Sequence, residues 1–297
     1  MGQVQRRSVR AQTFRVGDIL LADSSPKVSV VVPAYNEARH LRRCLRSLHS
    51  QALMPCELIV VDDGSRDETG AVAEAMGVMV IRTAHRGPAH ARNRGAALAR
   101  GDILVFVDAD IECSPAYLEN LVAPITRDGA TGAFSKEIYI GNLSSRWARA
   151  YALIRHLALP RLLPESHPDE SSNYRAIVRR RFLDVGGYDE VGYGEDMTLA
   201  PKLGELAVAA PKALCWHYNP DSLWEIFENA RWIGRGHDIG EVARPWLSNL
   251  PTSALRKGVC DVARGAELAI IPARLVYSFG ILTGLARRAI RPDWHWK

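Results

Sequence analysis

Residues 103–110 read Ile-Leu-Val-Phe-Val-Asp-Ala-Asp, the stretch from which the fold and the site of this chain can be worked out. Its apolar, β-branched part is typical of a strand buried inside a parallel sheet. The strand ends in Asp108 and Asp110, two carboxylates one residue apart. Mg²⁺ is typically held by one or two carboxylates together with substrate phosphates, and ligands of α/β sheets bind beyond the carboxyl ends of the strands. Taken alone, such a D-x-D is also an ordinary acidic turn.

The N-terminal part of the chain alternates between strand and helix patterns. Short apolar runs predict strands over 28–32, 58–61, 78–81 and 103–107. Apolar residues at helical spacing predict helices over 37–50, 68–76 and 89–99, and a fourth over 115–122 with Ser114 as its N-cap. This alternation predicts an α/β fold, a mostly parallel sheet flanked by helices on both faces.

After about residue 130 the alternation ends. We expect a strand over 133–140, a basic amphipathic helix over 147–159, and helices over 195–203 and 221–234. The tail over 255–290 is helix-prone and apolar with scattered arginines. Its longest uncharged piece is the 12 residues of 275–286, whereas about 20 are needed to span a bilayer. We therefore expect the tail to lie on a membrane or to pack on the domain.

The composition narrows the class of protein. The 297 residues, 47% of them hydrophobic, suffice for one large α/β domain or two small ones. Five cysteines without a C-x-x-C spacing favour free thiols over a zinc site. Residues 1–21 contain arginines but no long apolar segment, so we predict no secretory signal and a cytoplasmic location. The net charge of +5 suits an anionic partner, and the lack of nucleic-acid-binding motifs argues against nucleic acid.

Polar residues follow three of the predicted strands where they end. The segments are Pro33-Ala34-Tyr35-Asn36-Glu37, Asp62-Asp63-Gly64-Ser65 and Asp108-Ala109-Asp110. Arg92 and Asn93 lie on the third predicted helix, where a guanidinium can neutralise phosphate and an amide can bond a ribose or sugar. Because the carboxyl ends of parallel strands share one edge of a sheet, we expect a metal-dependent cradle for a nucleoside diphosphate.

Five segments in a fixed order resemble the inverting glycosyltransferases of family 2, which have the GT-A (Rossmann-like) fold. They are VSVVVPAYNE, ELIVVDDGSRDET, ARNRG, GDILVFVDAD and GGYDE with GEDMTL, and they cover about residues 27–219. A dehydrogenase would instead have G-x-G-x-x-G after its first strand, where this chain has P-A-Y-N-E. The resemblance implies a nucleoside-diphosphate sugar as donor, GDP-mannose or a UDP-sugar, and transfer of its sugar with inversion.

The resemblance also implies roles for individual residues. The donor would be bound by Pro33, Ala34, Tyr35, Glu37, Asp62, Asp63, Arg92, Asn93, Asp108 and Ala109. Asp108 and Asp110 would hold a Mn²⁺ or Mg²⁺ ion, with Asp110 the stronger ligand and His217 a candidate third ligand. Asp196 matches the family's catalytic base, which takes the proton of the acceptor hydroxyl. Glu195 would orient this base or bind the acceptor.

On this interpretation the chain has three parts. They are a basic arm over 1–26, a GT-A domain over 27–240 and a helical, membrane-associating extension over 241–297; the domain divides into a nucleotide-binding half over 27–128 and an acceptor half over 129–240. The apolar stripe of Trp147, Tyr151, Ile154 and Leu157 suits either an anionic lipid interface or packing on the sheet.

The acceptor and the activity remain open at this point. We expect a glycan or a polyprenyl-linked or other lipid-linked acceptor, and a peripheral protein on the cytoplasmic face of the membrane. Two alternatives are a nucleotidyltransferase of related fold, which would release pyrophosphate, and a nucleotide-sugar-binding module without catalysis.

Overall fold

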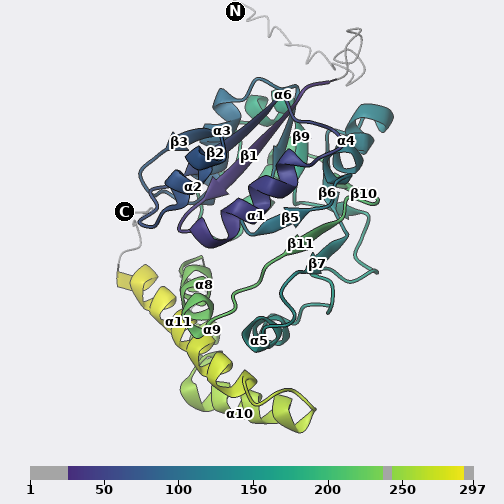
Figure 1. Ribbon diagram of the computed structural model, residues 1–297. Helices are drawn as coiled ribbons and strands as arrows, with labels where there is room; N and C mark the ends of the chain where they lie inside the picture. The colour runs from purple at the N-terminus through teal and green to yellow at the C-terminus, as the bar shows by residue number, and fades with distance from the viewer. Residues whose placement is uncertain (1–25, 237–242, 291–297) are drawn as a thin grey trace, which may run out of the picture.

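The strands predicted over 28–32, 58–61, 78–81 and 103–107 are neighbours in one sheet of the computed structural model, which describes residues 26–236 and 243–290. They are β1 (Val28–Ala34), β2 (Glu57–Asp62), β3 (Met79–Arg82) and β4 (Ile103–Phe106), and they pair in parallel. The sheet continues through β9 (Ala176–Val178), β6 (Gly132–Ser135), β10 (Ala207–Ala210) and β8 (Glu170–Ser171). Its order is β3-β2-β1-β4-β9-β6-β10-β8, with β9 antiparallel to both neighbours (Figure 1).

Side-chain alternation along β1 decides how the helices cover the sheet, because successive residues of a strand point to opposite faces. Val28, Val30 and Val32 pack on the side of α1 (Ala38–His49), α2 (Thr69–Ala75) and α4 (Tyr117–Asp128). Val31 packs on the opposite side with α3 (Pro88–Leu98), α6 (Arg179–Asp184) and α7 (Leu199–Leu203). The predicted α/β fold, a mostly parallel sheet with helices on both faces, is confirmed.

A smaller sheet next to the carboxyl edge corrects one prediction. It consists of β5 (Ile111–Cys113), β11 (Cys215–His217) and β7 (Ile138–Ile140), in the order β5-β11-β7. The single strand predicted over 133–140 is wrong, because β6 and β7 belong to different sheets. The chain changes sheets at Lys136 and Glu137, whose side chains bond Asp169 and the Lys212 amide outside the ladder.

The start of α4 also differs from the prediction. We expected Ser114 as the N-cap and Pro115 as the first helical residue, but the helix begins at Tyr117 with Ala116 as its cap residue. The carbonyl of Ser114 accepts a hydrogen bond from the Gln51 side chain, and that of Pro115 accepts one from the Ala52 amide. These bonds hold the two residues in a turn ahead of the helix.

A group of helices lies beneath the sheet in Figure 1. It consists of α5 (Arg146–Ile154), α8 (Leu223–Arg235), α9 (Ala243–Ser248), α10 (Pro251–Ala263) and α11 (Ile270–Ile290). Glycines let α8 and α11 pack closely: a Cβ on Gly280 would lie 2.6 Å from the Phe227 carbonyl oxygen, and one on Gly284 would meet the Arg231 carbonyl. The tail predicted over 255–290 therefore packs partly on the rest of the chain.

The apolar stripe of the predicted basic helix is part of this packing. Tyr151 and Ile154 are buried against Ile226 of α8 and Ile270 of α11, so the stripe packs on these two helices, whereas the prediction had it pack on the sheet. The helix also ends at Ile154, before the predicted residue 159. Among the described residues, no helix has both the length and the apolar character needed to cross a bilayer. The expected basic arm and the expected boundary at residue 240 lie outside the described residues, apart from Pro26.

Candidate active site

Sheet register brings two of the predicted metal ligands together. After β4 the chain passes through Asp108 and Asp110 into β5, which pairs antiparallel with β11 so that His217 lies opposite Ile111. His217 is thereby next to Asp110, and its Nε2 atom is 3.3 Å from Asp110 Oδ2. The backbone amide of Tyr218 also donates to the Asp110 carbonyl, at 3.0 Å. The fold thus joins one residue from each of the two predicted halves of the domain.

These two side chains fit part of a divalent-cation site. The side-chain oxygen of Asn219 lies 3.1 Å from His217 Nδ1; since this oxygen can only accept, Nδ1 donates to it, and Nε2 is the ring nitrogen that would bind a metal. Asp110 Oδ1 is buried and has no hydrogen-bond partner among the described residues. A carboxylate with one unpartnered oxygen, Oδ1, and with its other oxygen, Oδ2, beside an imidazole nitrogen suits Mg²⁺ or Mn²⁺, whose further ligands would come from substrate phosphates.

The surrounding charge favours a cation. Burial, followed by the carboxylates of Asp110, Glu225 and Asp108, raises the pKa of Glu37 well above its ordinary value. Negative groups are therefore crowded at this edge. No cluster of three or more His, Cys, Asp or Glu side chains could hold a metal within the described part of the chain, so phosphate oxygens would have to complete the ligand set.

Asp108, the first residue of the D-x-D, makes different contacts. Its Oδ1 atom accepts from Arg92 at 2.7 Å and its Oδ2 atom accepts from Arg175 at 2.7 Å. Burial would raise the pKa of Asp108, but Arg175 and Arg92 outweigh it and hold that pKa well below its ordinary value. The two predicted metal ligands of the D-x-D are thus unlike: Asp108 is neutralised by guanidinium groups, whereas Asp110 is not.

The segment of the predicted base is tied to the same arginines. Arg92 Nη1 donates to Glu195 Oε1 at 2.5 Å, so one guanidinium joins the D-x-D to the Glu195–Asp196 pair. Glu195 is buried at 4% exposure. Asp196 is half-buried, and its Oδ2 accepts from the Asn173 side chain at 3.0 Å. The helix predicted over 195–203 is split into a 3₁₀ turn, η2 (Glu195–Met197), and α7, so the acidic pair sits in the tight turn.

Two sequence motifs meet through Asn93. Its side-chain amide donates to the Tyr188 carbonyl at 2.8 Å, and its oxygen accepts from the Tyr188 amide at 2.9 Å. A Cβ on Gly187 would run into the Asn93 oxygen, and Gly187 has a φ of 69° that favours glycine. In this structure Asn93 therefore clamps the GGYDE turn that precedes the acidic pair.

The predicted base-binding edge contains one open aromatic face. Tyr35 is 37% exposed and stacks on His85 with ring centroids 3.8 Å apart. Pro33 and Ala34 are buried in β1. Asp63 is buried and accepts from the Thr83 hydroxyl and the amides of Arg86 and Gly87, so it shapes the loop that carries His85. Asp62 caps the turn beside it by accepting from the Ser65 amide at 2.9 Å.

The structure thus assembles most of the predicted residues at one edge of the sheet but gives some of them protein partners. Arg92 has 8% of its side chain exposed and faces two carboxylates. Its predicted contact with donor phosphate, like the predicted donor contacts of Asp63 and Asn93, stays a prediction.

Two residues of the site were missed by sequence reasoning. Arg175 neutralises Asp108, and Asn173 holds Asp196. Both lie just before β9, a three-residue strand with arginines on both sides, which is too short for a periodicity signal. An N-x-R run ahead of an apolar triplet is the only sequence feature that marks them.

Comparison with known sequences agrees with this geometry. The family model described as "Glycosyl transferase family 2" matches residues 29–186. The chain belongs to glycosyl transferase family 2.

Among its relatives, polypeptide N-acetylgalactosaminyltransferase 8 of Drosophila melanogaster is 33% identical over 190 residues, 56% of this chain and 32% of that protein. The 4,4'-diaponeurosporenoate glycosyltransferase of Staphylococcus haemolyticus is 34% identical over 125 residues, 39% of this chain and 33% of that protein. The chain spans about a third of the length of these relatives.

Solved structures show the same fold. The mannosyltransferase PcManGT from Pyrobaculum calidifontis, in complex with GDP-Man and Mn²⁺, superimposes with a TM-score of 0.55 over 94% of each chain, at 22% identity. Glucosyl-3-phosphoglycerate synthase from Mycobacterium tuberculosis, in complex with Mg²⁺ and UDP, gives a TM-score of 0.50 at 25% identity and covers 74% of this chain and 82% of that one. The predicted GT-A fold is confirmed.

Proposed function

We propose that this chain is a metal-dependent inverting glycosyltransferase that moves a sugar from a nucleoside-diphosphate sugar to a hydroxyl or phosphate acceptor. The observation that carries the proposal is the chain of ion pairs Glu195–Arg92–Asp108–Arg175, in which Glu195 and Arg92 are buried and Asp108 and Arg175 are half-buried. It holds the segment with Asp110 and the segment with Asp196 in one site. A binding module without catalysis has no need for an acidic pair fixed in this way.

The residues present suit the two ends of an inverting transfer. Asp110 and His217 would hold the cation, which when bound supplies charge neutralisation for the departing diphosphate. Asp196 takes the proton of the acceptor hydroxyl as the acceptor oxygen attacks the anomeric carbon, on the side opposite the leaving group. Asn173 donates to one Asp196 oxygen, which leaves the other oxygen to accept this proton. Glu195 is buried against Arg92 and orients the turn.

The donor class is supported by the base-binding edge and by the relatives. The exposed ring of Tyr35 can stack on a base. Solved structures with this fold contain GDP-Man with Mn²⁺ in one case and UDP with Mg²⁺ in another. We therefore propose GDP-mannose or a UDP-sugar as donor, bound together with Mn²⁺ or Mg²⁺.

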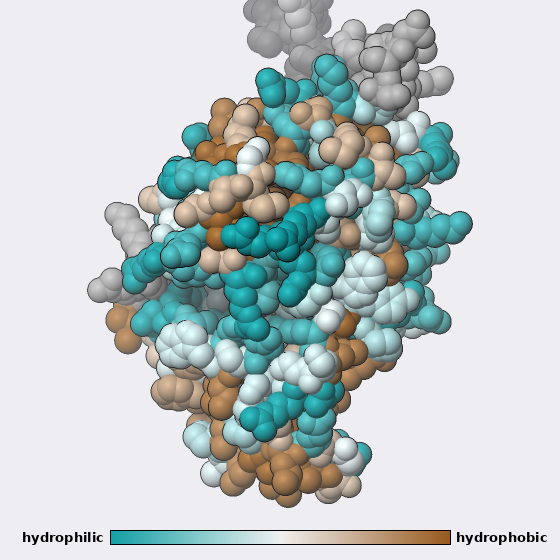
Figure 2. All heavy atoms as spheres, in the orientation of Figure 1, coloured by the Kyte–Doolittle hydropathy of each residue, from teal (hydrophilic) through white to brown (hydrophobic). Residues whose placement is uncertain are grey.

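A lipid-linked acceptor and peripheral membrane contact are supported by the exposed apolar side chains of the helical group. Trp224 is 68% exposed, Phe279 61%, Val259 53% and Leu255 47%. Figure 2 shows apolar residues gathered at the foot of the molecule, where α10 lies in Figure 1, with hydrophilic residues directly above. Apolar side chains mixed with arginines and lysines suit a surface of acidic lipid headgroups.

Donor turnover is the first test. The purified chain is incubated with Mn²⁺ and a panel of nucleotide sugars, and melting temperature and released nucleotide are measured. We expect one donor to raise the melting temperature, since a ligand of the native state stabilises it, and to yield a nucleoside diphosphate on turnover. Release of pyrophosphate instead would identify a nucleotidyltransferase, and donor binding without any turnover across acceptors would favour the binding module.

Membrane contact is tested on the full-length chain. Leu255→Glu/Val259→Glu should lower co-flotation with anionic vesicles several-fold, because both side chains are exposed on α10 and their change removes apolar contact. Leu98→Glu/Leu206→Glu is the matched control, since Leu98 is 48% and Leu206 46% exposed on the α/β domain. Equal flotation of both variants and the unaltered chain would refute the α10 contact.

A further inference from the structure

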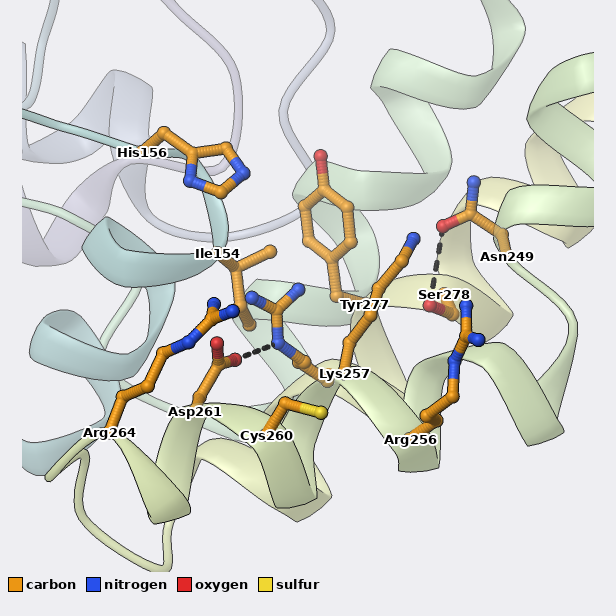
Figure 3. Close-up of a pocket in the computed structure, with 11 residues that line it drawn as sticks. Ile154, His156, Asn249, Arg256, Lys257, Cys260, Asp261, Arg264, Tyr277 and Ser278 are labelled. Carbon is orange, nitrogen blue, oxygen red and sulfur yellow. Dashed lines mark hydrogen bonds and ion pairs between the residues drawn. The ribbon is translucent and has the colours of Figure 1, made fainter.

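A cavity lies among the helices beneath the sheet, and none of the candidate active-site residues lines it. It has a volume of about 470 Å³ and is formed by the end of α5 and the α10–α11 hairpin. Small-molecule pockets span about 300–1,000 Å³. In Figure 3 the side chains of Arg256, Lys257 and Arg264 extend upward from α10, and Tyr277 and His156 lie on the upper side of the view.

The lining carries an excess of positive charge. Its basic residues include Arg256, Lys257, Arg264 and Arg274, and its one acidic residue, Asp261, is ion-paired with Arg274. Within residues 26–236 and 243–290, the guanidinium groups of Arg256 and Arg264 have no ion-pair or hydrogen-bond partner. The positive charges of Arg256 and Arg264 therefore face one cavity, and no described residue supplies them with a counter-ion. Burial, followed by Arg274 and Arg256, lowers the pKa of Lys257, as expected of an ammonium in such a field.

The donors present match a phosphate group. Guanidinium groups bind phosphate oxygens with paired N–H donors, and lysine adds a point charge. The Lys257 ammonium donates one hydrogen bond to the Ser248 carbonyl at 2.8 Å and keeps further protons for a ligand. Tyr277 accepts from Arg155 at 3.1 Å, so its own hydroxyl proton is free to donate. A carboxylate would use fewer of these donors than a tetrahedral phosphate does.

The same helix offers an apolar face beside these donors. Residues four apart on a helix share a face, so Arg256, Cys260 and Arg264 line the cavity while Leu255 and Val259 form the adjoining exposed stripe. A phosphate at the end of a hydrocarbon chain could enter the cavity while its chain follows this stripe. We propose that the cavity binds the phosphate group of a lipid-linked substrate, an inference that rests on the proposed lipid-linked acceptor.

One arginine connects this cavity with the loop of the predicted base. Arg155 donates to the Tyr277 hydroxyl from Nη1 and to the Tyr193 hydroxyl from Nη2, at 3.1 and 2.7 Å. Tyr193 precedes the Glu195–Asp196 pair by two residues. Arg155 thus links Tyr277, which would bind the phosphate, to Tyr193, which belongs to the loop of the predicted base. A substrate site needs this proximity to the catalytic loop.

The test measures binding of the full-length chain to phosphatidylcholine vesicles doped with polyprenyl monophosphate, and to vesicles of equal charge doped with phosphatidylglycerol. We expect the unaltered chain to prefer the monophosphate vesicles, and Arg256→Gln/Arg264→Gln to lose this preference by about tenfold or more, since two charge-assisted hydrogen-bonding groups are removed. Both side chains are exposed and unpartnered, so the variant should keep its melting temperature. Arg42→Gln/Arg46→Gln is the matched control, because it removes the same charge from the exposed face of α1.

Four results would overturn the proposed phosphate site or its lipid ligand. Equal binding of the Arg256/Arg264 variant and the unaltered chain, or equal losses in both double variants, overturns the site. The absence of any preference for monophosphate over phosphatidylglycerol also overturns it. A second arm titrates inorganic phosphate by calorimetry at saturating nucleoside diphosphate: heat that depends on Arg256 and Arg264, without a vesicle preference, would overturn the lipid source and leave a free phosphate as the ligand.

Donor binding separates this proposal from the proposed function. The Arg256→Gln/Arg264→Gln variant should bind a nucleoside diphosphate with Mn²⁺ as the unaltered chain does, since neither arginine belongs to the candidate active site. If no form of the chain binds a nucleotide, the glycosyltransferase proposal fails, whatever the vesicles show. If nucleotide binds normally and the vesicle preference is absent, only the phosphate site fails.

Discussion

Replacing Arg92 by alanine tests the central contact of the candidate active site. The guanidinium lies between Glu195 Oε1, at 2.5 Å, and Asp108 Oδ1, at 2.7 Å, and 8% of the arginine side chain is exposed. Asp108 would keep Arg175 as a partner, but Glu195 would be left buried without a positive charge. Breaking a buried ion pair by removing one partner costs about 3–5 kcal/mol. We expect a loss of that order in the free energy of unfolding.

Urea unfolding measures this loss, with Arg127→Ala as the control. Arg127 pairs with Glu119, and the two side chains are 71% and 53% exposed; exposed pairs contribute only about 0–1 kcal/mol. Adding Glu195→Gln to Arg92→Ala should recover part of the loss, because the uncompensated charge is then gone. The difference between the double variant and the sum of the two single variants gives the interaction free energy of the Arg92–Glu195 pair, since the residues are in contact.

The sequence alone suggested a different result, in which Arg92 binds the donor diphosphate directly. On that hypothesis Arg92→Ala would leave the unfolding midpoint unchanged and would weaken binding of a nucleoside diphosphate much more than that of the nucleoside. Observing this pair of results would falsify the structural role argued here. Loss of stability together with equal weakening of both ligands would confirm it.

Three further predictions concern the site and the helical group. Asp110→Ala should abolish the Mn²⁺ dependence of nucleoside-diphosphate binding in calorimetry, and chelation of the metal should weaken the unaltered chain to the same level; unchanged Mn²⁺ dependence would remove Asp110 from the metal site. Asp196→Asn should keep donor binding but lower kcat by about 10²–10⁴, and a wild-type rate would mean that another group is the base. Gly284→Leu should cost about 1–3 kcal/mol in urea unfolding by overpacking the α8–α11 contact at the Arg231 carbonyl, whereas Ala289→Leu on the exposed face should cost little; equal effects would argue against that contact.

The parallel half of the sheet and its edge could be predicted from the sequence for a physical reason. Strands such as β1 and β4 are buried on both faces, so each is a continuous apolar run, and polar residues follow immediately at its carboxyl end. Such local patterns can be read from the sequence because they do not depend on how distant segments pack. The placement of Tyr35, Asp62 and Asp108 at one edge follows from parallel pairing alone.

The rest depended on contacts between distant segments. β9 is short and antiparallel, and its neighbours Asn173 and Arg175 reach the site only because β9 pairs between β4 and β6. The two partners of Arg92 come from the segment after β4 and from the turn before α7, and no local pattern can reveal this pairing. The two-sheet course of residues 132–140 was missed because the charged break at Lys136 and Glu137 looks like the exposed face of one strand.

The two carboxylates of the D-x-D differ in their partners, since Asp108 is paired with two arginines and Asp110 with none among the described residues, and this difference determines the net charge of the site. Arg92 and Arg175 are balanced by Asp108 and Glu195, so these four groups, two buried and two half-buried, are neutral together. Within residues 26–236 and 243–290, Asp110 and Asp196 have no basic side chain at ion-pair distance, apart from the imidazole of His217 next to Asp110. The open part of the site is therefore negative, and a bare diphosphate would be repelled from it. Charge balance thus favours a diphosphate that binds together with a divalent cation, which the unpartnered Asp110 oxygen can coordinate. The neutral ion pairs and the Asn173 contact fix the turn that carries Asp196.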